Sequence, residues 1–375
     1  MDRMINQQRL VDEFLKLVQI DSETGEEAEI AKVLKEIFTD LGLEVVEDGS
    51  QKETGFGADN LICTLPANAE AKPIYFTSHM DTVVPGKGVK PQREGDYITS
   101  DGTTILGADD KAGLAVMIET IRCLREQELP HGEIQFVITV GEESGLVGAK
   151  ALDRSQLRAE LGYALDSDGP VGDLVVAAPT QVKFFATING VTAHAGVAPE
   201  KGVSAITIAS KAIAKMPLGR IDEETTANIG RFEGGQKTNI VCDYVEVLAE
   251  ARSLVPEKVN AQVEKMKQAF KDAAEELGGS VDIETTQMYS GFKLTEEDEV
   301  VQIAQKAVQA INRESVLKQS GGGSDANIIS GYGIPTVNLA VGYENIHTTK
   351  ERMPVTELVK LTELVLEIIN QVTKQ

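Results

Sequence analysis

Cysteine is scarce in this sequence, and the few cysteines present cannot form a disulfide framework. Cys63, Cys123 and Cys242 lie far apart, no two of them have a CxxC spacing, and their number is odd. Small secreted proteins are rich in paired cysteines, and structural zinc sites require clustered thiolates. The cysteine pattern therefore argues against both classes and favours a reducing, cytoplasmic compartment.

Long apolar runs and an excess of positive charge are also absent. No apolar stretch approaches the roughly 18 to 20 residues that a membrane-spanning helix needs, and the charged first twenty residues predict neither a signal peptide nor an anchor. The 36 Lys and Arg residues face 59 Asp and Glu residues, which gives a formal net charge of −23. Such an acidic surface repels nucleic acid and anionic membranes, so we expect neither as a partner.

The chain has enough apolar material for two domains, with 375 residues of which 42% are hydrophobic. Its first half alternates helical with apolar strand patterns. The helical patterns are 7–19, 30–41 and 111–128, and the strand patterns are 60–65, 74–78, 134–140 and 161–165. This order predicts an α/β sandwich with a largely parallel central sheet.

The pattern changes near residue 178. The order then becomes strand, helix, two strands, helix and strand, and helix–strand alternation returns after residue 292. These six patterns are 182–189, 203–216, 227–232, 244–251, 258–277 and 281–288. Residues 179–291 are therefore predicted to be an inserted α+β domain, with residues 1–178 and 292–375 forming the first domain.

Imidazole and carboxylate side chains follow the strands of the first domain. His79 and Asp81, in SHMDTV, end the strand pattern 74–78, and residues two apart in an extended chain point the same way. Ligands bind at the carboxyl ends of parallel strands, and a carboxylate beside a histidine is typical of a metal-bound imidazole. A surface pair without a function explains this motif about equally well.

Two acidic pairs stand at the ends of other elements. Asp109 and Asp110, in GADDKAG, open the 111–128 helix, where one aspartate would suffice as a cap and the other could bridge two cations. Glu142 and Glu143, in GEESGLVGAK, follow the next strand and repel each other unless a cation or proton compensates. One glutamate could bind metal while the other acts as general base; a solvated acidic turn is the alternative.

A fourth acidic group and a further histidine complete the pattern. The spacing in YALDSDG does not decide between Asp166 and Asp168, and His347, in ENIHTTKERMP, could supply a second imidazole. Nitrogen and oxygen ligands without thiolates suit zinc, cobalt or manganese. His131, in a Pro-His-Gly turn, is expected at the surface, and His194 lies in the inserted domain.

Together and in this order, these motifs resemble the co-catalytic zinc metallopeptidases typified by peptidase T. That family includes aminopeptidases, dipeptidases, carboxypeptidases and deacylases, and the match runs from His79 to His347. The resemblance implies a three-layer zinc-peptidase domain with a mixed, mostly parallel sheet. It also implies that the inserted domain is a ferredoxin-like lid and dimerisation domain, and that the chain hydrolyses the amide bond of small peptides.

The resemblance further implies a role for each motif residue. Two divalent ions, with zinc expected before cobalt or manganese, would share Asp109 as a bridging ligand. Glu142 would be the general base, and Asp81 would orient His79. One ion would be held by His79, Asp109 and Asp166, and the other by Asp109, Glu143 and His347.

In the inserted domain the resemblance implies three substrate contacts. His194, in GVTAHAG, would stabilise the tetrahedral intermediate, Arg252, in EARSLVPEK, would hold a substrate carboxylate, and Asn239, in KTNIV, would add a polar contact. The alternative interpretation of His194 is a histidine in a turn without a catalytic role. The alternative interpretation of Arg252 is a salt bridge at the edge of a strand.

Two departures from peptidase T leave tripeptide selectivity open. The stretch between His79 and Asp109 is shorter, and the Gly-rich turn 320–327 lacks the arginine expected before it. We therefore expect a short-peptide hydrolase, acting as a homodimer through the inserted domain. A deacylase of N-acyl amino acids, a dipeptidase or carboxypeptidase, and a non-catalytic metal-binding scaffold are the alternatives.

Overall fold

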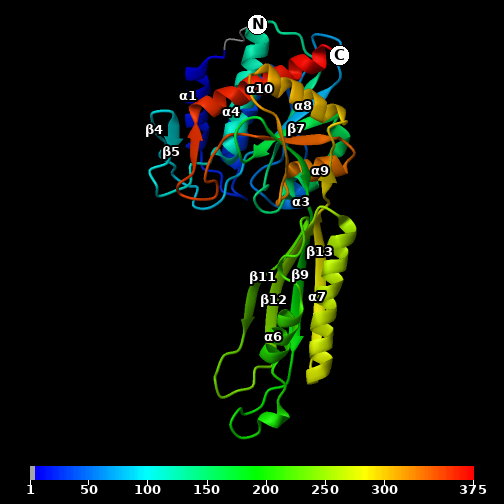
Figure 1. Cartoon of the computed structure of the whole chain (residues 1–375). Helices are drawn as coiled ribbons and strands as arrows, with labels where there is room; N and C mark the ends of the chain where they lie inside the picture. The colour runs from blue at the N-terminus through cyan, green and yellow to red at the C-terminus, as the bar shows by residue number, and fades with distance from the viewer. Residues whose placement is uncertain (1–4) are drawn as a thin grey trace. The chain divides into compact units, whose positions relative to one another are not determined.

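The computed structural model describes residues 5–375, which form two compact units (Figure 1). The first unit runs to Val176 and resumes over Leu294–Gln319 and Ser324–Gln375. The inserted unit comprises Ala177–Lys293 and the short segment Ser320–Gly323. Residues 1–4 of the predicted first domain lie outside the described part. No helix within residues 5–375 is long and apolar enough to cross a membrane.

The first unit is built on a mixed sheet. Its central strands β6, β3, β7 and β16 are parallel, and the strands added on either side are antiparallel. This confirms the predicted α/β fold with a mixed sheet. In order across the sheet the strands are β1 (Glu44–Glu47), β2 (Leu61–Leu65), β6 (Ile134–Thr139), β3 (Ile74–His79), β7 (Leu161–Ser167), β16 (Thr336–Ala340), β8 (Asp173–Ala178) and β14 (Phe292–Lys293), with β15 (Val316–Gln319) also paired to β8.

Alternate residues of these strands enter two different hydrophobic clusters, which makes three layers. Phe76 and Phe136 belong to the larger cluster, whereas Tyr75 and Val137, one position away, belong to the smaller one, as the two-residue period of a strand requires. The smaller cluster is covered by the segment after α5 (Val147–Ala151) and by α9 (Asp325–Gly331). The helices of the larger cluster, several of them labelled in Figure 1, are α1 (Gln7–Val18), α2 (Ala28–Asp40), α4 (Ala108–Glu126), α8 (Glu299–Ala310) and α10 (Val355–Thr373).

Several short elements were not predicted from the sequence. Two of them join segments that are distant along the chain, because Met353 of β17 (Arg352–Pro354) pairs with Ile98 of β5 (Tyr97–Thr99). The short elements are α3 (Gln51–Thr54), β4 (Gln92–Glu94), β5 (Tyr97–Thr99), the 3-10 turns η1 (Arg154–Gln156) and η2 (Pro199–Lys201), β14 (Phe292–Lys293) and β17 (Arg352–Pro354).

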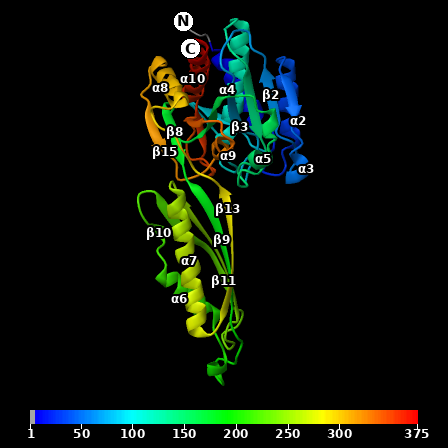
Figure 2. The same cartoon turned by 90° about the vertical axis from the view of Figure 1, so that its right-hand side faces the viewer.

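The inserted unit is an antiparallel sheet covered on one face by two helices, α6 (Ala205–Lys215) and α7 (Pro256–Leu277), as Figure 2 shows. Along β9, Phe184 is buried against Phe270 of α7, with ring centroids 5.8 Å apart, while Lys183 is exposed. This confirms the α+β character predicted for the insertion. The strand order is β10 (Gly219–Arg220), β11 (Thr225–Gly234), β12 (Tyr244–Ser253), β9 (Thr180–Asn189) and β13 (Ser280–Tyr289).

His131 departs from its predicted surface position. Its side chain is only 4% exposed, its Nδ1 lies 2.7 Å from the carbonyl oxygen of Gly132, and its own carbonyl accepts the N–H groups of Asn68 and Ala69. The Pro-His-Gly turn is therefore packed against a second loop, which the local sequence does not reveal.

Candidate metal centre

The register of the parallel strands brings the predicted motifs to one edge of the sheet. His79, the last residue of β3, pairs with Thr139, the last residue of β6, and the Glu142–Glu143 turn follows directly. Asp166 lies near the end of β7, the neighbour of β3 on its other side. Motifs separated by up to 87 residues therefore meet because carboxyl ends of parallel strands share an edge (79 to 166).

The start of α4 separates the roles of its two aspartates. Gly107 has φ +78°, a left-handed conformation that glycine adopts without strain, and Asp109 and Asp110 have non-helical dihedral angles. Asp110 then accepts the backbone N–H of Gly113 through Oδ1 at 3.2 Å, as an N-cap residue does. Asp110 therefore caps the helix, and the Asp109 carboxylate is free to face the imidazoles.

Gly113 makes room for this cap. A Cβ at this position would lie 2.7 Å and 2.8 Å from the two carboxylate oxygens of Asp110 and 2.9 Å from Oγ of Ser78. Ser78 in turn donates to the backbone carbonyl of Asp110 at 3.0 Å. The last glycine of GADDKAG is therefore required by close packing beneath the Asp110 carboxylate.

Asp109 stands between the two imidazoles. Its Oδ1 lies 3.0 Å from Nε2 of His79, and its Oδ2 lies 3.1 Å from Nε2 of His347. Nε2 of His79 is also 3.6 Å from Oδ1 of Asp166, and Nε2 of His347 is 2.9 Å from Oε1 of Glu143. Each oxygen of one carboxylate thus faces a different nitrogen–carboxylate pair, which is the geometry of a bridging ligand.

Three sets of side chains at this edge have donor atoms within 4.8 Å of one another. Two of the sets share Asp109, and the third brings Glu142 beside His79 and Glu143. The sets are His79 with Asp109 and Asp166, Asp109 with Glu143 and His347, and His79 with Glu142 and Glu143.

Asp81 contacts both His79 and the glutamate turn. Nδ1 of His79 lies 3.0 Å from the backbone carbonyl of Asp81 and 3.4 Å from its Oδ1. The two carboxylate oxygens accept the backbone N–H groups of Glu142 at 3.0 Å and Glu143 at 3.2 Å. Asp81 therefore orients the imidazole mainly through its main chain and fixes the turn through its side chain.

The buried carboxylates and imidazoles of the cluster shift one another's pKa values. Burial raises the pKa of Asp166 to about 7, and burial with the neighbouring charge of Asp166 raises the pKa of Glu142 well above its usual range. Bonds to Asp109 and Glu143 raise the pKa of His347 to about 10. Burial opposes the charge of His79, yet its bonds to Asp109, Asp166 and Asp81 outweigh burial and raise its pKa well above the ordinary value. Positive charge is therefore strongly favoured within the cluster around Asp109.

The geometry distinguishes Asp166 from Asp168, a choice that the spacing left open and that the resemblance made in favour of Asp166. Asp166 faces His79 and also accepts the hydroxyl of Tyr343 at 3.3 Å, while Asp168 is exposed and lines a hollow of about 570 Å³ that includes none of the donor side chains. Tyr343, 2% exposed, was not singled out from the sequence. Its position four residues before His347 is the signal that could have drawn attention to it.

Comparison with known proteins identifies the family of this chain. Residues 75–371 match peptidase family M20/M25/M40. The chain belongs to this family. It is therefore a hydrolase of the metallopeptidase class, as the sequence motifs predicted, and the resemblance to peptidase T-like enzymes is confirmed.

Three relatives of this M20 peptidase are similar over almost their whole length. The crystal structure of the aminopeptidase PepT from Bacillus cereus ATCC 10987 is 68% identical, with a TM-score of 0.94 over 98% of this chain and 99% of that one. A tripeptidase from Staphylococcus aureus subsp. aureus Mu50 is 55% identical, with a TM-score of 0.97 over 99% and 100%. The uncharacterized protein YqjE of Bacillus subtilis (strain 168) is 66% identical over 371 residues, 99% of this chain and 100% of its own.

The donor set of this M20 peptidase fits a pair of divalent ions. It consists of imidazole nitrogens and carboxylate oxygens without thiolates, which suits zinc, cobalt or manganese. Two imidazoles balance at most two of the five carboxylates of the cluster. The carboxylates are those of Asp81, Asp109, Glu142, Glu143 and Asp166.

Arg252 lies in the inserted unit and is already paired there. Its Nε and Nη2 donate to the carboxylate of Glu250 at 2.9 Å and 3.1 Å, and its Nη1 donates to the carbonyl of Gly321 at 3.1 Å. The strand-edge salt bridge that the sequence offered as the plainer reading is therefore present. A substrate carboxylate would have to share this guanidinium with Glu250.

His194 and Asn239 lie together, at the opposite end of β12 from Arg252. His194 pairs with Ile240, and the N–H of Ala195 donates to the carbonyl of Asn239 at 3.0 Å. Both side chains are exposed. These loops precede Tyr244, where β12 begins, and the ten residues of the strand span about 30 Å before it ends beside Arg252.

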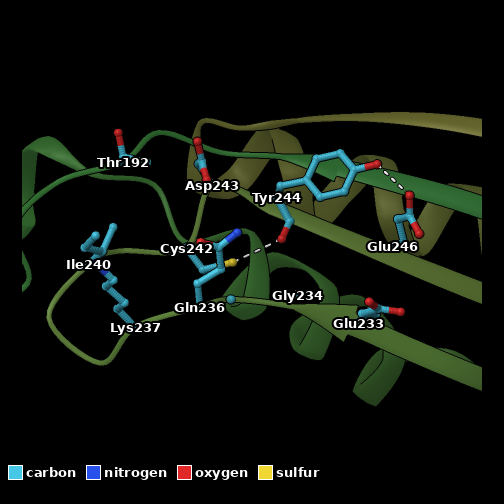
Figure 3. A pocket seen from close by; sticks show the side chains of 11 residues that line it. Thr192, Glu233, Gly234, Gln236, Lys237, Ile240, Cys242, Asp243, Tyr244 and Glu246 are labelled. Carbon is cyan, nitrogen blue, oxygen red and sulfur yellow. Dashed lines mark hydrogen bonds between the residues drawn. The ribbon is translucent and has the colours of Figure 1, made fainter.

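A hollow of about 540 Å³ lies at the same end of the inserted unit (Figure 3). Lys237 and Ile240 line it, and so does Cys242, whose Sγ donates to the carbonyl of Tyr244 at 3.1 Å. All its lining residues belong to the inserted unit, and none of them is one of the donor side chains around Asp109.

Proposed function

We propose that this M20 peptidase hydrolyses the peptide bond of short peptides and that it uses two divalent metal ions bound in the cluster around Asp109. Zinc is the metal that we propose first. The observation that carries the proposal is the position of Asp109, whose two oxygens each face a different imidazole at 3.0 and 3.1 Å. His79 and Asp166 would complete one ligand set, and Glu143 and His347 the other. Bound there, the ions would activate a water molecule and polarise the scissile carbonyl.

Glu142 is the general base of this proposal. It belongs to the same turn as Glu143 and lies in the donor set of His79, so it reaches the cluster without pairing with an imidazole nitrogen in the structure. It accepts a proton from the attacking water and then donates it to the leaving amine. Asp81 holds the backbone of the Glu142–Glu143 turn by two hydrogen bonds, which keeps the base in place.

The similarity to a PepT aminopeptidase and to a tripeptidase, at 68% and 55% identity, supports short peptides with a free amino terminus as substrates. Arg252 would then hold the peptide carboxylate, with His194 stabilising the oxyanion and Asn239 adding a polar contact. The three unpaired cysteines of the described chain support a cytoplasmic setting.

The distance between these contacts supports a homodimer. Arg252 and His194 stand at opposite ends of a strand that spans about 30 Å, far more than the length of a tripeptide, about 10 Å. One inserted unit cannot offer both groups to the same short substrate. Both roles are compatible only if a second copy of the chain supplies one of the two residues.

Metal analysis and product analysis test the proposal. The purified protein should contain two metal ions per chain and cleave tripeptides in a chelator-sensitive manner. Cleavage of N-acetyl amino acids alone would replace the peptidase by a deacylase on the same site, and dipeptide or carboxy-terminal products would change the substrate class. A protein without stoichiometric metal would refute the proposal.

Substitutions of the two adjacent glutamates provide a matched pair. Glu142→Gln should retain both ions and lose about 100- to 10,000-fold in kcat, whereas Glu143→Gln should lose affinity for one ion. An active Glu142→Gln enzyme would show that the base lies elsewhere.

A further inference from the structure

Glu351 is a buried carboxylate to which the family motifs assigned no role. Its side chain is 1% exposed, and it lies four residues after His347 in the loop that joins β16 to β17. An acidic side chain is rarely buried so fully unless hydrogen-bond donors surround it. The donors around Glu351 indicate what it does.

Three backbone N–H groups converge on this carboxylate. Oε2 accepts from Leu106 and Gly107, both at 2.8 Å, and Oε1 accepts from Asp109 at 3.0 Å. These donors form the turn that leads into α4. Glu351 therefore holds both oxygens against the backbone of the residue whose side chain stands between the imidazoles.

The same short loop contacts Asp109 at two places. Glu351 binds the backbone N–H of Asp109, and His347 lies 3.1 Å from its side-chain Oδ2. Glu351 is itself anchored, because its N–H donates to Thr348 at 3.1 Å and the next residue, Arg352, pairs with Thr99 of β5. The position of Asp109 relative to His347 is thus fixed from one anchored segment.

We infer that Glu351 is a positioning residue for the bridging carboxylate, because its buried side chain clamps the Leu106–Asp109 backbone to the loop that carries His347. The inference rests on the proposed two-metal function. Glu351 touches neither the substrate nor the ions; it sets where Asp109 stands. Groups that support ligands in this way typically change metal affinity or activity by about 10- to 100-fold when they are replaced.

Glu351→Gln is the direct test. A glutamine offers one acceptor oxygen, and its amide NH₂ would face a backbone N–H in either orientation, so at least one of the three donors is left unpaired. Glu351→Asp keeps the charge but withdraws the carboxylate by one methylene, about 1.5 Å. If positioning is the role, both variants are impaired, and the aspartate does not restore the site by its charge alone.

Glu27→Gln is the matched control. Glu27 is 0% exposed, and its carboxylate likewise accepts two backbone N–H groups, from Gly25 at 2.8 Å and from Gly57 at 3.2 Å. Neither donor is a proposed metal ligand. The control therefore loses buried hydrogen bonds of the same kind, from donors that lie outside the proposed ligand sets.

Binding of Co²⁺ to the metal-free protein is measured by calorimetry and by visible absorption. Thermal unfolding, and kcat and KM with a tripeptide, are measured on the same variants. We expect the Glu351 variants to bind Co²⁺ about 10- to 100-fold more weakly, with an altered absorption spectrum and a lower kcat. Glu27→Gln should lower the unfolding temperature and leave Co²⁺ affinity and spectrum as in the wild type.

The outcomes separate this inference from the proposed function. Wild-type protein that takes up no stoichiometric Co²⁺ would overturn both. Two ions in the wild type, with the same affinity and spectrum in Glu351→Gln, would overturn the role of Glu351 alone. Loss of the folded state in both Glu351 variants, but not in Glu27→Gln, would also overturn it, because Glu351 would then determine the fold and not the geometry of the site.

Discussion

Alanine at position 113 should damage the centre without touching a proposed ligand. The new Cβ would lie 2.7–2.9 Å from three oxygen atoms, the two carboxylate oxygens of Asp110 and Oγ of Ser78. Ordinary contact begins at 3.4 Å, so these oxygens would have to retreat by about 0.5–0.7 Å (3.4 − 2.9 and 3.4 − 2.7). Ser78 is held on β3 directly before His79, so the strain falls on both segments that carry proposed metal ligands.

The expected magnitude follows from this displacement. Overpacking by one methyl group in a filled interior costs about 1–3 kcal/mol of stability. Functional side chains must be held within about 0.5 Å of their working geometry, and an error of about 1 Å can cost 100-fold in rate. Gly113→Ala should therefore lose about 1–3 kcal/mol in the free energy of unfolding and about 10- to 100-fold in kcat/KM.

Urea unfolding of the metal-free protein and steady-state kinetics at saturating metal measure the two effects. Gly331→Ala is the matched control, since a Cβ at this position, at the end of α9, would meet nothing within 4 Å. The control should be about as stable as the wild type, or more so by about 0.4–1 kcal/mol. If Gly113→Ala equals Gly331→Ala in both measurements, the packing argument for GADDKAG is wrong.

Three further predictions test other parts of the chain. Burial lowers the pKa of His131, so below about pH 6.5 the unfolded state binds more protons than the folded state, and the free energy of unfolding decreases as the pH decreases. Urea unfolding at pH 8 and at pH 5.5 should show a smaller decrease for His131→Gln than for the wild type. An equal decrease would contradict this prediction. Burial raises the pKa of Cys63 and raises that of Cys123 to about 12; intact mass after iodoacetamide treatment of the folded protein should show alkylation at the partly exposed Cys242 alone, and a second adduct would refute it. Arg252→Met should raise KM for tripeptides with a free carboxylate and leave KM for their amides unchanged; a similar rise for both would count against the carboxylate contact.

Hydrophobic periodicity predicted the long elements of the chain because their burial is nearly uniform along each of them. β3 and β6 are buried at every position, and the expected ranges 74–78 and 134–140 differ from the observed strands by one residue. The short strand β4 is exposed at all three positions, so no apolar pattern marks it. It exists because its partner β5 also pairs with β17, some 250 residues later along the chain.

Residue type and spacing predicted that several acidic motifs meet at one edge of the sheet, but the choice within each pair came from the family resemblance alone. The choice between Asp109 and Asp110 depends on backbone dihedral angles at the start of α4, where Asp110 turns back to cap the helix. The choice between Asp166 and Asp168 depends on where β7 ends, because Asp166 lies within the strand whereas Asp168 follows its last residue, Ser167, and is exposed. Neither quantity can be derived from residue type and spacing.

Chemically identical carboxylates around this centre divide into two classes by what faces them. Asp109 and Glu143 face imidazole nitrogens at 2.9–3.1 Å, whereas Asp81 and Glu351 accept backbone N–H groups, with Nδ1 of His79 farther from Asp81 at 3.4 Å. The oxygens of a carboxylate that faces the backbone already accept directed hydrogen bonds. Such a carboxylate is therefore a poor metal ligand, but it holds the backbone segment in place. Removing a carboxylate of the first class should remove a ligand and reduce the number of ions bound. Removing one of the second class should leave that number unchanged and lower the affinity for each ion. Measurement of stoichiometry and affinity together, and not of activity alone, therefore distinguishes a ligand from the residue that holds it.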